Sequence, residues 1–245
     1  HGVRFFDAPA EGIGVDDVFN RLEGFVPELV VVDTSTPSIY NDVEVTEKIK
    51  EKFPSIFTVL VGTHPSSLPE ETLNLSNSIN AVAVGEYDFT IRELSRALED
   101  NRSLDDVEGL VFKKGDEIVK NGYRLKIDNL DEIPFVTSVY KRYLHCRSYF
   151  FAAANYPMVM TITGRGCPFK CFFCVYPQVF HGRKYRTRSP ENVVDEFEYV
   201  VRNFPEVKEM GIEDDCFTAN RRHVRDICEL LIKRRIKMKW YCNVR

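Results

Sequence analysis

Three closely spaced cysteines are the residues of this chain best suited to chemistry. Cys167, Cys171 and Cys174 form a C-x3-C-x2-C array. The apolar, β-branched run of residues 159–163 precedes it and predicts a strand that leads into a loop. Gly166 lets the backbone bend sharply beside the first cysteine, so we expect the three thiolates to converge on one metal centre.

Three ligands are one fewer than a closed site needs. A structural zinc ion takes four ligands, and an electron-transfer 4Fe–4S cluster is held by four cysteines. An array of three therefore predicts a metal position that stays open for a substrate or cofactor. The alternative is a zinc-binding module whose fourth ligand lies elsewhere in the sequence. The candidates for that ligand are His181, Cys216 and Cys228.

Composition excludes several classes of protein. The chain has 245 residues, of which 44% are hydrophobic and 29% charged, as in a globular protein with a sizeable core. No apolar run approaches the ~20 residues of a membrane span. A net charge of −4 argues against a nucleic-acid-binding surface. Seven cysteines, three of them clustered, favour metal binding in a reducing cytoplasm over a disulfide framework.

The cysteine array, with the aromatic Phe173 before its last cysteine, resembles the signature of the radical S-adenosylmethionine (SAM) superfamily. The resemblance implies that Cys167, Cys171 and Cys174 hold three irons of a 4Fe–4S cluster and that Phe173 helps to place SAM. In that family SAM chelates the fourth iron, and an electron from the cluster cleaves SAM to a 5′-deoxyadenosyl radical.

Residues 1 to about 100 alternate short apolar strands with amphipathic helices. This alternation predicts a parallel, doubly wound sheet. The expected strands are residues 3–6, 29–32, 57–61 and 81–84. In such sheets, ligands bind beyond the carboxyl ends of the strands.

Small polar residues and glycines follow three of these strands, at residues 33–38, 62–67 and 85–87. Any α/β domain carries such residues in its turns, so spacing alone leaves their role open. The three loops, with Asp7-Ala8-Pro9 at the head of the chain, also resemble the cobalamin-binding domain of one radical SAM subfamily. The residues that the resemblance assigns to cobalamin are Thr34, Ser35, Thr36, Ser38, Gly62, Thr63 and Gly85. The D-x-H-x-x-G motif with an axial histidine is absent, and His64 is either an axial ligand or a loop histidine.

The middle of the chain is expected to connect two domains. Residues 104–123 predict a β-hairpin with its turn at residues 113–116, and the acidic segment 128–134 resembles an interdomain linker. His145 and Cys146 lie in an aromatic-rich segment, which we interpret as packing between domains; the alternative is a second pair of metal ligands.

Two helices and two strands are expected after the cysteine array, and the second helix is expected to begin at Thr218 or Asn220. Ser189 and Pro190 predict a helix start, and residues 207–212 and 239–244 predict strands. The basic run of residues 183–188 is interpreted as an exposed loop.

Three consecutive acids, Glu213-Asp214-Asp215, follow the strand expected at residues 207–212. Acids in this position are costly unless they bind something. The resemblance implies contacts to SAM, for which we favour Glu213 and Asp214. Arg245, at the same end of the next strand, is assigned to SAM as well. The alternative is a capping cluster for the following helix.

We therefore expect an α/β protein with two domains. Residues 1–103 would form a Rossmann-like (flavodoxin-like) cobalamin-binding domain whose first strand is missing. Residues 104–156 would form the hairpin and linker, and residues 157–245 the first part of a radical SAM (β/α) partial TIM barrel. Both ends of the sequence look cut, so we interpret it as a fragment.

The function that the resemblance implies is that of a cobalamin-dependent radical SAM enzyme with a 4Fe–4S cluster, SAM and cobalamin as cofactors. We expect the enzyme to methylate a small organic substrate; cyclisation or rearrangement of the substrate is the alternative. Flavodoxin or ferredoxin would be its reductant, and the cytoplasm its location. One alternative is a radical SAM enzyme whose N-terminal domain binds no cobalamin; another is the non-catalytic zinc-binding module.

Overall fold

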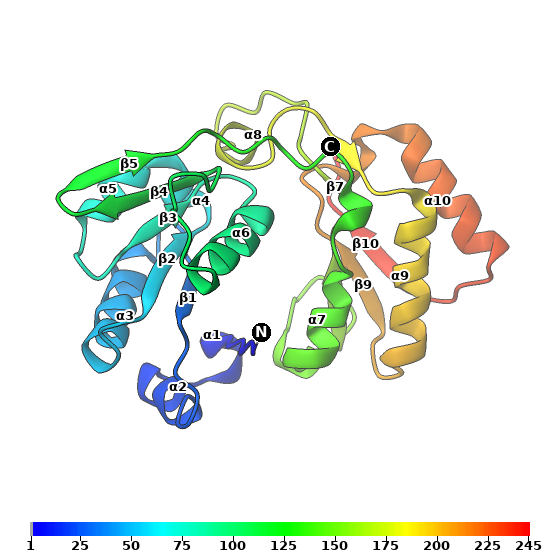
Figure 1. Cartoon of the computed structure of the whole chain (residues 1–245). Helices are drawn as coiled ribbons and strands as arrows, with labels where there is room; N and C mark the ends of the chain where they lie inside the picture. The colour runs from blue at the N-terminus through cyan, green and yellow to red at the C-terminus, as the bar shows by residue number, and fades with distance from the viewer. Residues whose placement is uncertain (1) are drawn as a thin grey trace. The chain divides into compact units, whose positions relative to one another are not determined.

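The computed structural model describes residues 2–245, which form two compact units. The five-stranded unit consists of Phe19–Ile127 and Cys171–His181. The three-stranded unit consists of the described residues up to Val18, Asp128–Lys170 and Gly182–Arg245. Figure 1 shows the elements of each unit in chain order.

The five-stranded sheet has the order β1-β2-β3-β4-β5. Strands β1 to β3 are parallel, whereas β4 pairs antiparallel with β3, and β5 with β4. The strands are β1 (Leu29–Asp33), β2 (Phe57–Val61), β3 (Ala81–Ala83), β4 (Leu110–Lys114) and β5 (Glu117–Lys120). The helices are α2 (Val15–Arg21, at the unit boundary), α3 (Ile39–Lys52), α4 (Thr63–Ser67), α5 (Pro69–Asn74), α6 (Asp88–Glu99) and α8 (Tyr176–Val179). The expected hairpin thus extends the first sheet.

Helices cover both faces of this sheet because alternate strand residues point to opposite sides. Val59 and Ala81 pack with Leu94 of α6 in one buried cluster. Leu60 and Val82, their neighbours in sequence, belong to a second cluster that includes residues of α3 and α5. The predicted α/β class with a parallel sheet is confirmed.

The three-stranded sheet has the order β10-β9-β6, with all strands parallel. Its strands are β6 (Met158–Thr161), β9 (Glu209–Ile212) and β10 (Lys239–Cys242), and β7 (Gly164–Arg165) pairs separately with β8 (Arg186–Thr187). The helices are α1 (Ala8–Glu11), α7 (Val136–Tyr143), α9 (Pro190–Asn203) and α10 (Arg221–Lys233), with 3-10 turns at Leu130–Glu132, Cys146–Ser148 and Phe217–Ala219.

Helices α9 and α10 contribute to the main core of this unit (Figure 1). Phe197 of α9 and Ile227 of α10 are buried with Met210 and Ile212 of β9. Alternate residues of β9 therefore face the helices, and Gly211 points to the other face of the sheet.

Both predicted helix starts carry the expected caps. The Ser189 side chain accepts a hydrogen bond from the Asn192 amide, and Pro190 is the first residue of α9. The Asn220 side chain accepts hydrogen bonds from the amides of Arg222 and His223 at the start of α10.

One expectation about local structure was wrong and another was correct only in part. Residues 3–6 form no strand, and Val3 and Phe5 are exposed, because an apolar run becomes a strand only where a sheet edge pairs with it. The basic run 183–188 is exposed at Arg183 and Lys184, but it continues into β8 and becomes buried. Its last residue, Arg188, is 7% exposed, and its Nη1 lies 2.5 Å from Oε2 of the fully buried Glu196.

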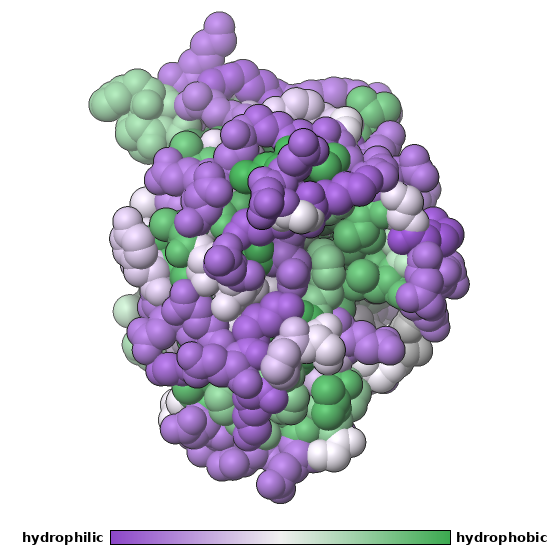
Figure 2. All heavy atoms as spheres, turned by 60° about the vertical axis from the view of Figure 1, so that its left-hand side comes forward, coloured by the Kyte–Doolittle hydropathy of each residue, from purple (hydrophilic) through white to green (hydrophobic). Residues whose placement is uncertain are grey.

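The described residues include no helix long and apolar enough to cross a membrane. Figure 2 shows a face on which hydrophilic side chains predominate and apolar side chains form separate smaller areas.

His223 makes the core of the three-stranded unit sensitive to acid. It is buried at the start of α10, its ring lies 6.3 Å from that of Phe217, and its Nε2 has no hydrogen-bond partner among residues 2–245. Burial lowers the pKa of His223 to about 4. Because the unfolded chain binds this proton more readily, the stability contributed by neutral His223 is fully present above about pH 6.5. It is lost as the pH falls towards 4.

We expect His223→Phe to reduce the loss of unfolding free energy between pH 7 and pH 4 by at most about 3 kcal/mol. Trp240 is the single tryptophan of the chain, and its ring lies 5.8 Å from that of Phe217. Its fluorescence during urea unfolding at each pH measures the effect. His145→Phe, at an exposed position, is the matched control. An equal pH dependence in the wild type and in His223→Phe would contradict the assignment.

Candidate functional site

The first part of the cysteine loop is held against the segment that leads into β8. Gly164 pairs with Thr187, and the Cys167 amide donates to the Gly182 carbonyl at 3.0 Å. A Cβ on Gly164 would lie 2.6 Å from the Tyr185 ring. A Cβ on Gly166, where φ is +98°, would overlap the Lys184 carbonyl oxygen. Both glycines are therefore required for this close approach.

Asp214 ties the end of β9 to the start of this loop. Its Oδ1 accepts hydrogen bonds from the amides of Thr163 (2.6 Å) and Gly164 (3.0 Å). Its Oδ2 accepts from the hydroxyls of Thr163 (2.6 Å) and Tyr185 (2.6 Å). Burial raises the pKa of Asp214, and these hydrogen bonds act in the opposite direction. Asp214 is fully buried, and its four donors make it a structural anchor of the loop.

The neighbouring acids have different partners. Asp215 Oδ2 accepts from the Gly166 amide at 2.8 Å, inside the cysteine loop. Glu213 is half-buried; its carboxylate accepts from the Tyr241 hydroxyl at 2.8 Å and from Asn243 Nδ2 at 3.2 Å. Among the predicted SAM-binding residues, Glu213 therefore retains an accessible carboxylate.

Two arginines approach Phe169 in the loop. The guanidinium carbon of Arg245 lies 4.5 Å from the centre of the Phe169 ring, and Arg183 Nη1 donates to the Phe169 carbonyl at 2.7 Å. Arg245, predicted to contact SAM, thus lies beside the cysteine loop.

The second part of the loop belongs to the five-stranded unit. The Cys174 amide donates to the Cys171 carbonyl at 3.2 Å, and Gln178 Nε2 donates to the Cys174 carbonyl at 3.1 Å. Phe173 is 79% exposed and makes an edge contact with Phe172. Phe173 is thus available to a ligand.

No group of three or more histidine, cysteine, aspartate or glutamate side chains between residues 2 and 245 is arranged to hold a metal ion. The metal assignment therefore depends on the chemistry and spacing of the three thiols. His181, one candidate for a fourth zinc ligand, packs against Phe180. Cys216 is buried next to Phe217, and Cys228 lies on α10.

The three polar loops of the five-stranded unit meet at the carboxyl edge of its parallel strands. Gly62 has a φ of +110°, and a Cβ there would overlap the Thr34 carbonyl oxygen. Ser66 Oγ donates to the Gly62 carbonyl at 2.6 Å and accepts from the Gly85 amide at 3.0 Å. Ser66 therefore joins two of the loops.

The first polar loop is ordered by its hydroxyls. Ser38 Oγ accepts from the Ser35 amide at 3.2 Å, and the Thr34 hydroxyl donates to Asp42. Thr36 Oγ1 lies 3.2 Å from Nδ1 of the buried His64, and Thr63 begins α4 next to it. The structure thus brings all seven residues predicted to bind cobalamin to adjoining loops of this unit.

The sequence interpretation missed Ser66, Asp42, Tyr185 and Tyr241. Ser66 could have been identified, because a serine four residues after a glycine often bonds back to its carbonyl. Asp42 depends on Thr34, eight residues earlier in the chain. Tyr185 and Tyr241 depend on partners in distant segments, which leave no signal in the local sequence.

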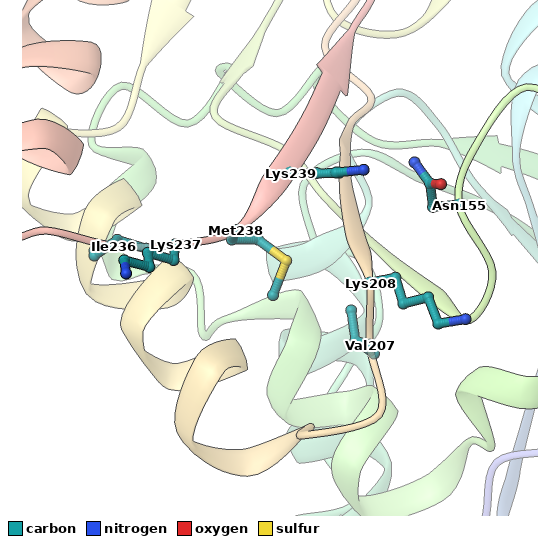
Figure 3. A pocket seen from close by; sticks show the side chains of 7 residues that line it. All are labelled: Asn155, Val207, Lys208, Ile236, Lys237, Met238 and Lys239. Atoms are coloured by element: carbon teal, nitrogen blue, oxygen red, sulfur yellow. The ribbon is translucent and has the colours of Figure 1, made fainter.

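A cavity of about 530 Å³ lies elsewhere in the three-stranded unit. It is lined by Asn155, Val207, Lys208, Ile236, Lys237, Met238 and Lys239, at the amino ends of β9 and β10 (Figure 3). The cysteine loop follows the carboxyl end of β6, which runs parallel to these strands. Cavity and loop therefore lie at opposite ends of the sheet, and we do not assign the cavity to the site.

We expect Asp214→Ala to loosen the cysteine loop, because it leaves two backbone amides and two hydroxyls without their acceptor. Hydrogen exchange of the Thr163 and Gly164 amides should become faster by about tenfold or more. Asp195→Ala, on the exposed side of α9, is the control. If exchange at these two amides stayed at the wild-type rate, the anchoring role would be excluded.

Two glycine substitutions distinguish the cost of a steric overlap from the cost of an unfavourable backbone conformation alone. Gly62 and Gly85 both have positive φ, but a Cβ on Gly85 has no atom within 4 Å. We expect Gly85→Ala to cost about 1 kcal/mol of stability and Gly62→Ala to cost more, on the order of 3 kcal/mol. Urea unfolding of both variants measures the difference, and equal losses would contradict the overlap with Thr34.

No family model matches the chain. Curated relatives align over most of it. An uncharacterised methyltransferase of Pyrococcus horikoshii is 29% identical over 100% of this chain and 52% of its own length. An anaerobic magnesium-protoporphyrin IX monomethyl ester cyclase of Rubrivivax gelatinosus is 30% identical over 99% of this chain and 43% of its own length. The cobalamin-dependent radical SAM methyltransferase TokK of Streptomyces tokunonensis is 24% identical over 83% of this chain and 30% of its own length.

The fold has a solved counterpart in the cobalamin-dependent SAM radical enzyme OxsB with aqua-cobalamin and SAM bound. The TM-score is 0.74 at 20% identity, over 93% of this chain and 32% of that one. This chain spans about half or less of the length of each relative. The relatives and the fold together confirm the resemblance of this chain to the radical SAM superfamily and, within it, to the subfamily with a cobalamin-binding domain.

Proposed function

We propose that this chain is part of a cobalamin-dependent radical SAM enzyme. The observation that carries the proposal is the C-x3-C-x2-C array, which follows the parallel strand β6 in a loop anchored by Asp214. In this proposal the three-stranded unit is the first part of a (β/α) partial TIM barrel. The five-stranded unit is then a Rossmann-like cobalamin-binding domain.

The donor set fits an iron–sulfur cluster. Cys167, Cys171 and Cys174 offer three soft thiolate ligands, which suit an iron–sulfur centre and leave one iron without a protein ligand. The rigid start of the loop, where Gly164 and Gly166 lie against the segment before β8, would fix the first of these ligands. The loop is thus partly ordered by the protein itself.

Three residues would bind SAM. Glu213 presents a half-exposed carboxylate beyond the end of β9, where the amino group of SAM could donate a hydrogen bond to it. Phe173 offers an exposed ring, and Arg245 offers a cation next to Phe169. Asp214, which we also favoured from sequence, would act indirectly, because all of its observed hydrogen bonds are to the loop and to Tyr185.

The carboxyl edge of the five-stranded sheet fits a large ligand that approaches the backbone closely. Gly62 and Gly85 leave the loop surface without side chains, and hydroxyl groups of the neighbouring loop residues can hydrogen-bond to a polar ligand. The residues proposed for cobalamin are Thr34, Ser35, Thr36, Ser38, Gly62, Thr63 and Gly85. We interpret His64 as a loop residue, because it is buried and lies within hydrogen-bonding distance of Thr36.

When bound, the cluster supplies the electron for SAM cleavage and cobalamin supplies a methyl carrier. The protein would orient both and exclude water. Methylation of a small organic substrate is our first choice, and cyclisation or rearrangement is the alternative. A flavodoxin or ferredoxin would supply electrons.

The test is anaerobic reconstitution of the full-length protein, followed by iron, sulfide and cobalt analysis and by EPR of the reduced sample. We expect about four irons per chain, bound cobalt, and an EPR signal that changes when SAM is added. Cys167→Ala, Cys171→Ala or Cys174→Ala should each abolish SAM cleavage, whereas Cys228→Ala on α10 should retain it. Zinc without iron would show a structural zinc module, and iron without cobalt would show a radical SAM enzyme that binds no cobalamin.

A further inference from the structure

Two side chains from the β10 segment hold the carboxylate of Glu213. Tyr241 in β10 donates its hydroxyl to Oε1 at 2.8 Å, and Asn243, just after β10, donates Nδ2 to Oε2 at 3.2 Å. The backbone of Glu213 is fixed as well, because its amide donates to the Thr161 carbonyl at 2.9 Å. The direction of this carboxylate is therefore set by three contacts from two neighbouring strands.

Gly211 makes this arrangement possible. It pairs with Tyr241 in the β9–β10 register, and a Cβ on Gly211 would lie 2.5 Å from the Tyr241 hydroxyl and 2.6 Å from Cζ. The ring thus lies against the bare backbone of β9, which brings the hydroxyl to Glu213, two residues further along the chain and just beyond the end of the strand. Phe151 packs against the same ring, with the two ring centres 5.7 Å apart.

Glu213 has acceptor capacity left for a ligand. A carboxylate offers about four lone-pair positions, and Tyr241 and Asn243 occupy two of them. Glu213 is half-buried, whereas Asp214 is fully buried and accepts four hydrogen bonds from its own unit. Burial and the nearby Glu213 raise the pKa of Tyr241, so its hydroxyl stays protonated and can only donate to the carboxylate.

We propose that Tyr241 and Asn243 are positioning residues that orient the Glu213 carboxylate towards the N–H groups of the amino group of SAM. The inference rests on the proposed function and adds to it how the site recognises that amino group. Gly211 has a specific part in this recognition, because any side chain there would displace the Tyr241 ring.

The test is equilibrium binding to the reconstituted, unreduced full-length protein with three ligands. SAM carries the amino group, decarboxylated SAM keeps it without the carboxylate, and methylthioadenosine lacks both groups. We expect Tyr241→Phe to weaken the binding of SAM and of decarboxylated SAM by about tenfold, since the freed carboxylate no longer points at the amino group. The affinity for methylthioadenosine should stay within about twofold of the wild type, because that ligand has no amino group to contact Glu213. Asn243→Ala should act in the same direction.

The controls separate positioning from damage to the fold. Tyr199→Phe, on α9, should leave all three affinities unchanged. In a Glu213→Gln background, Tyr241→Phe should have little further effect on SAM, because the two residues act through one contact. If Tyr241→Phe weakened the binding of all three ligands equally, or changed the binding of none of them, the positioning role would be overturned. If the wild type did not bind SAM at all, the proposed function itself would fail.

Discussion

The three-stranded unit depends on a buried carboxylate whose hydrogen bonds connect segments far apart in the sequence. Asp214 accepts from residues 29, 50 and 51 positions earlier in the chain, namely Tyr185, Gly164 and Thr163. A buried carboxylate is tolerated only where donors replace its water. The end of β9, the start of the cysteine loop and the segment before β8 must therefore form together. The start of the loop that carries Cys167 is consequently held in place by the protein.

A second buried acid, on helix α9, also connects segments that are far apart in the sequence. Glu196 of α9 accepts from the Thr137 amide (3.0 Å) and hydroxyl (2.8 Å), from the Thr161 hydroxyl (2.6 Å) and from Arg188. A buried ion pair adds little net stability by itself, because desolvation offsets the attraction. Its effect is geometric: it fixes where α7, β6 and the end of β8 meet. Asp214 and Glu196 thus hold the two sides of the strand that leads to the cysteines.

Local patterns in the sequence predicted most of the elements but little of this network. Apolar runs and caps such as Ser189 and Asn220 gave the strands and helix starts, because these depend on neighbours within a few residues. The cysteine array was visible for the same reason. The burial of Arg188 was not, since it depends on Glu196 and on residues of β6 that only the fold brings near. Residues 3–6 have the composition of a strand, but a strand also needs a partner edge, which composition does not encode.

The different roles of Glu213 and Asp214 follow from strand geometry. Met210 and Ile212 face the helices, and Asp214 continues that alternation into a buried position. Gly211 and Glu213 face the opposite side, where Tyr241 lies. Adjacent acids at a strand end therefore cannot both serve the core and a ligand. Asp214 anchors the loop, and Glu213 remains accessible. Gly211, two residues before Glu213, leaves room for the Tyr241 ring, whose hydroxyl donates to the Glu213 carboxylate.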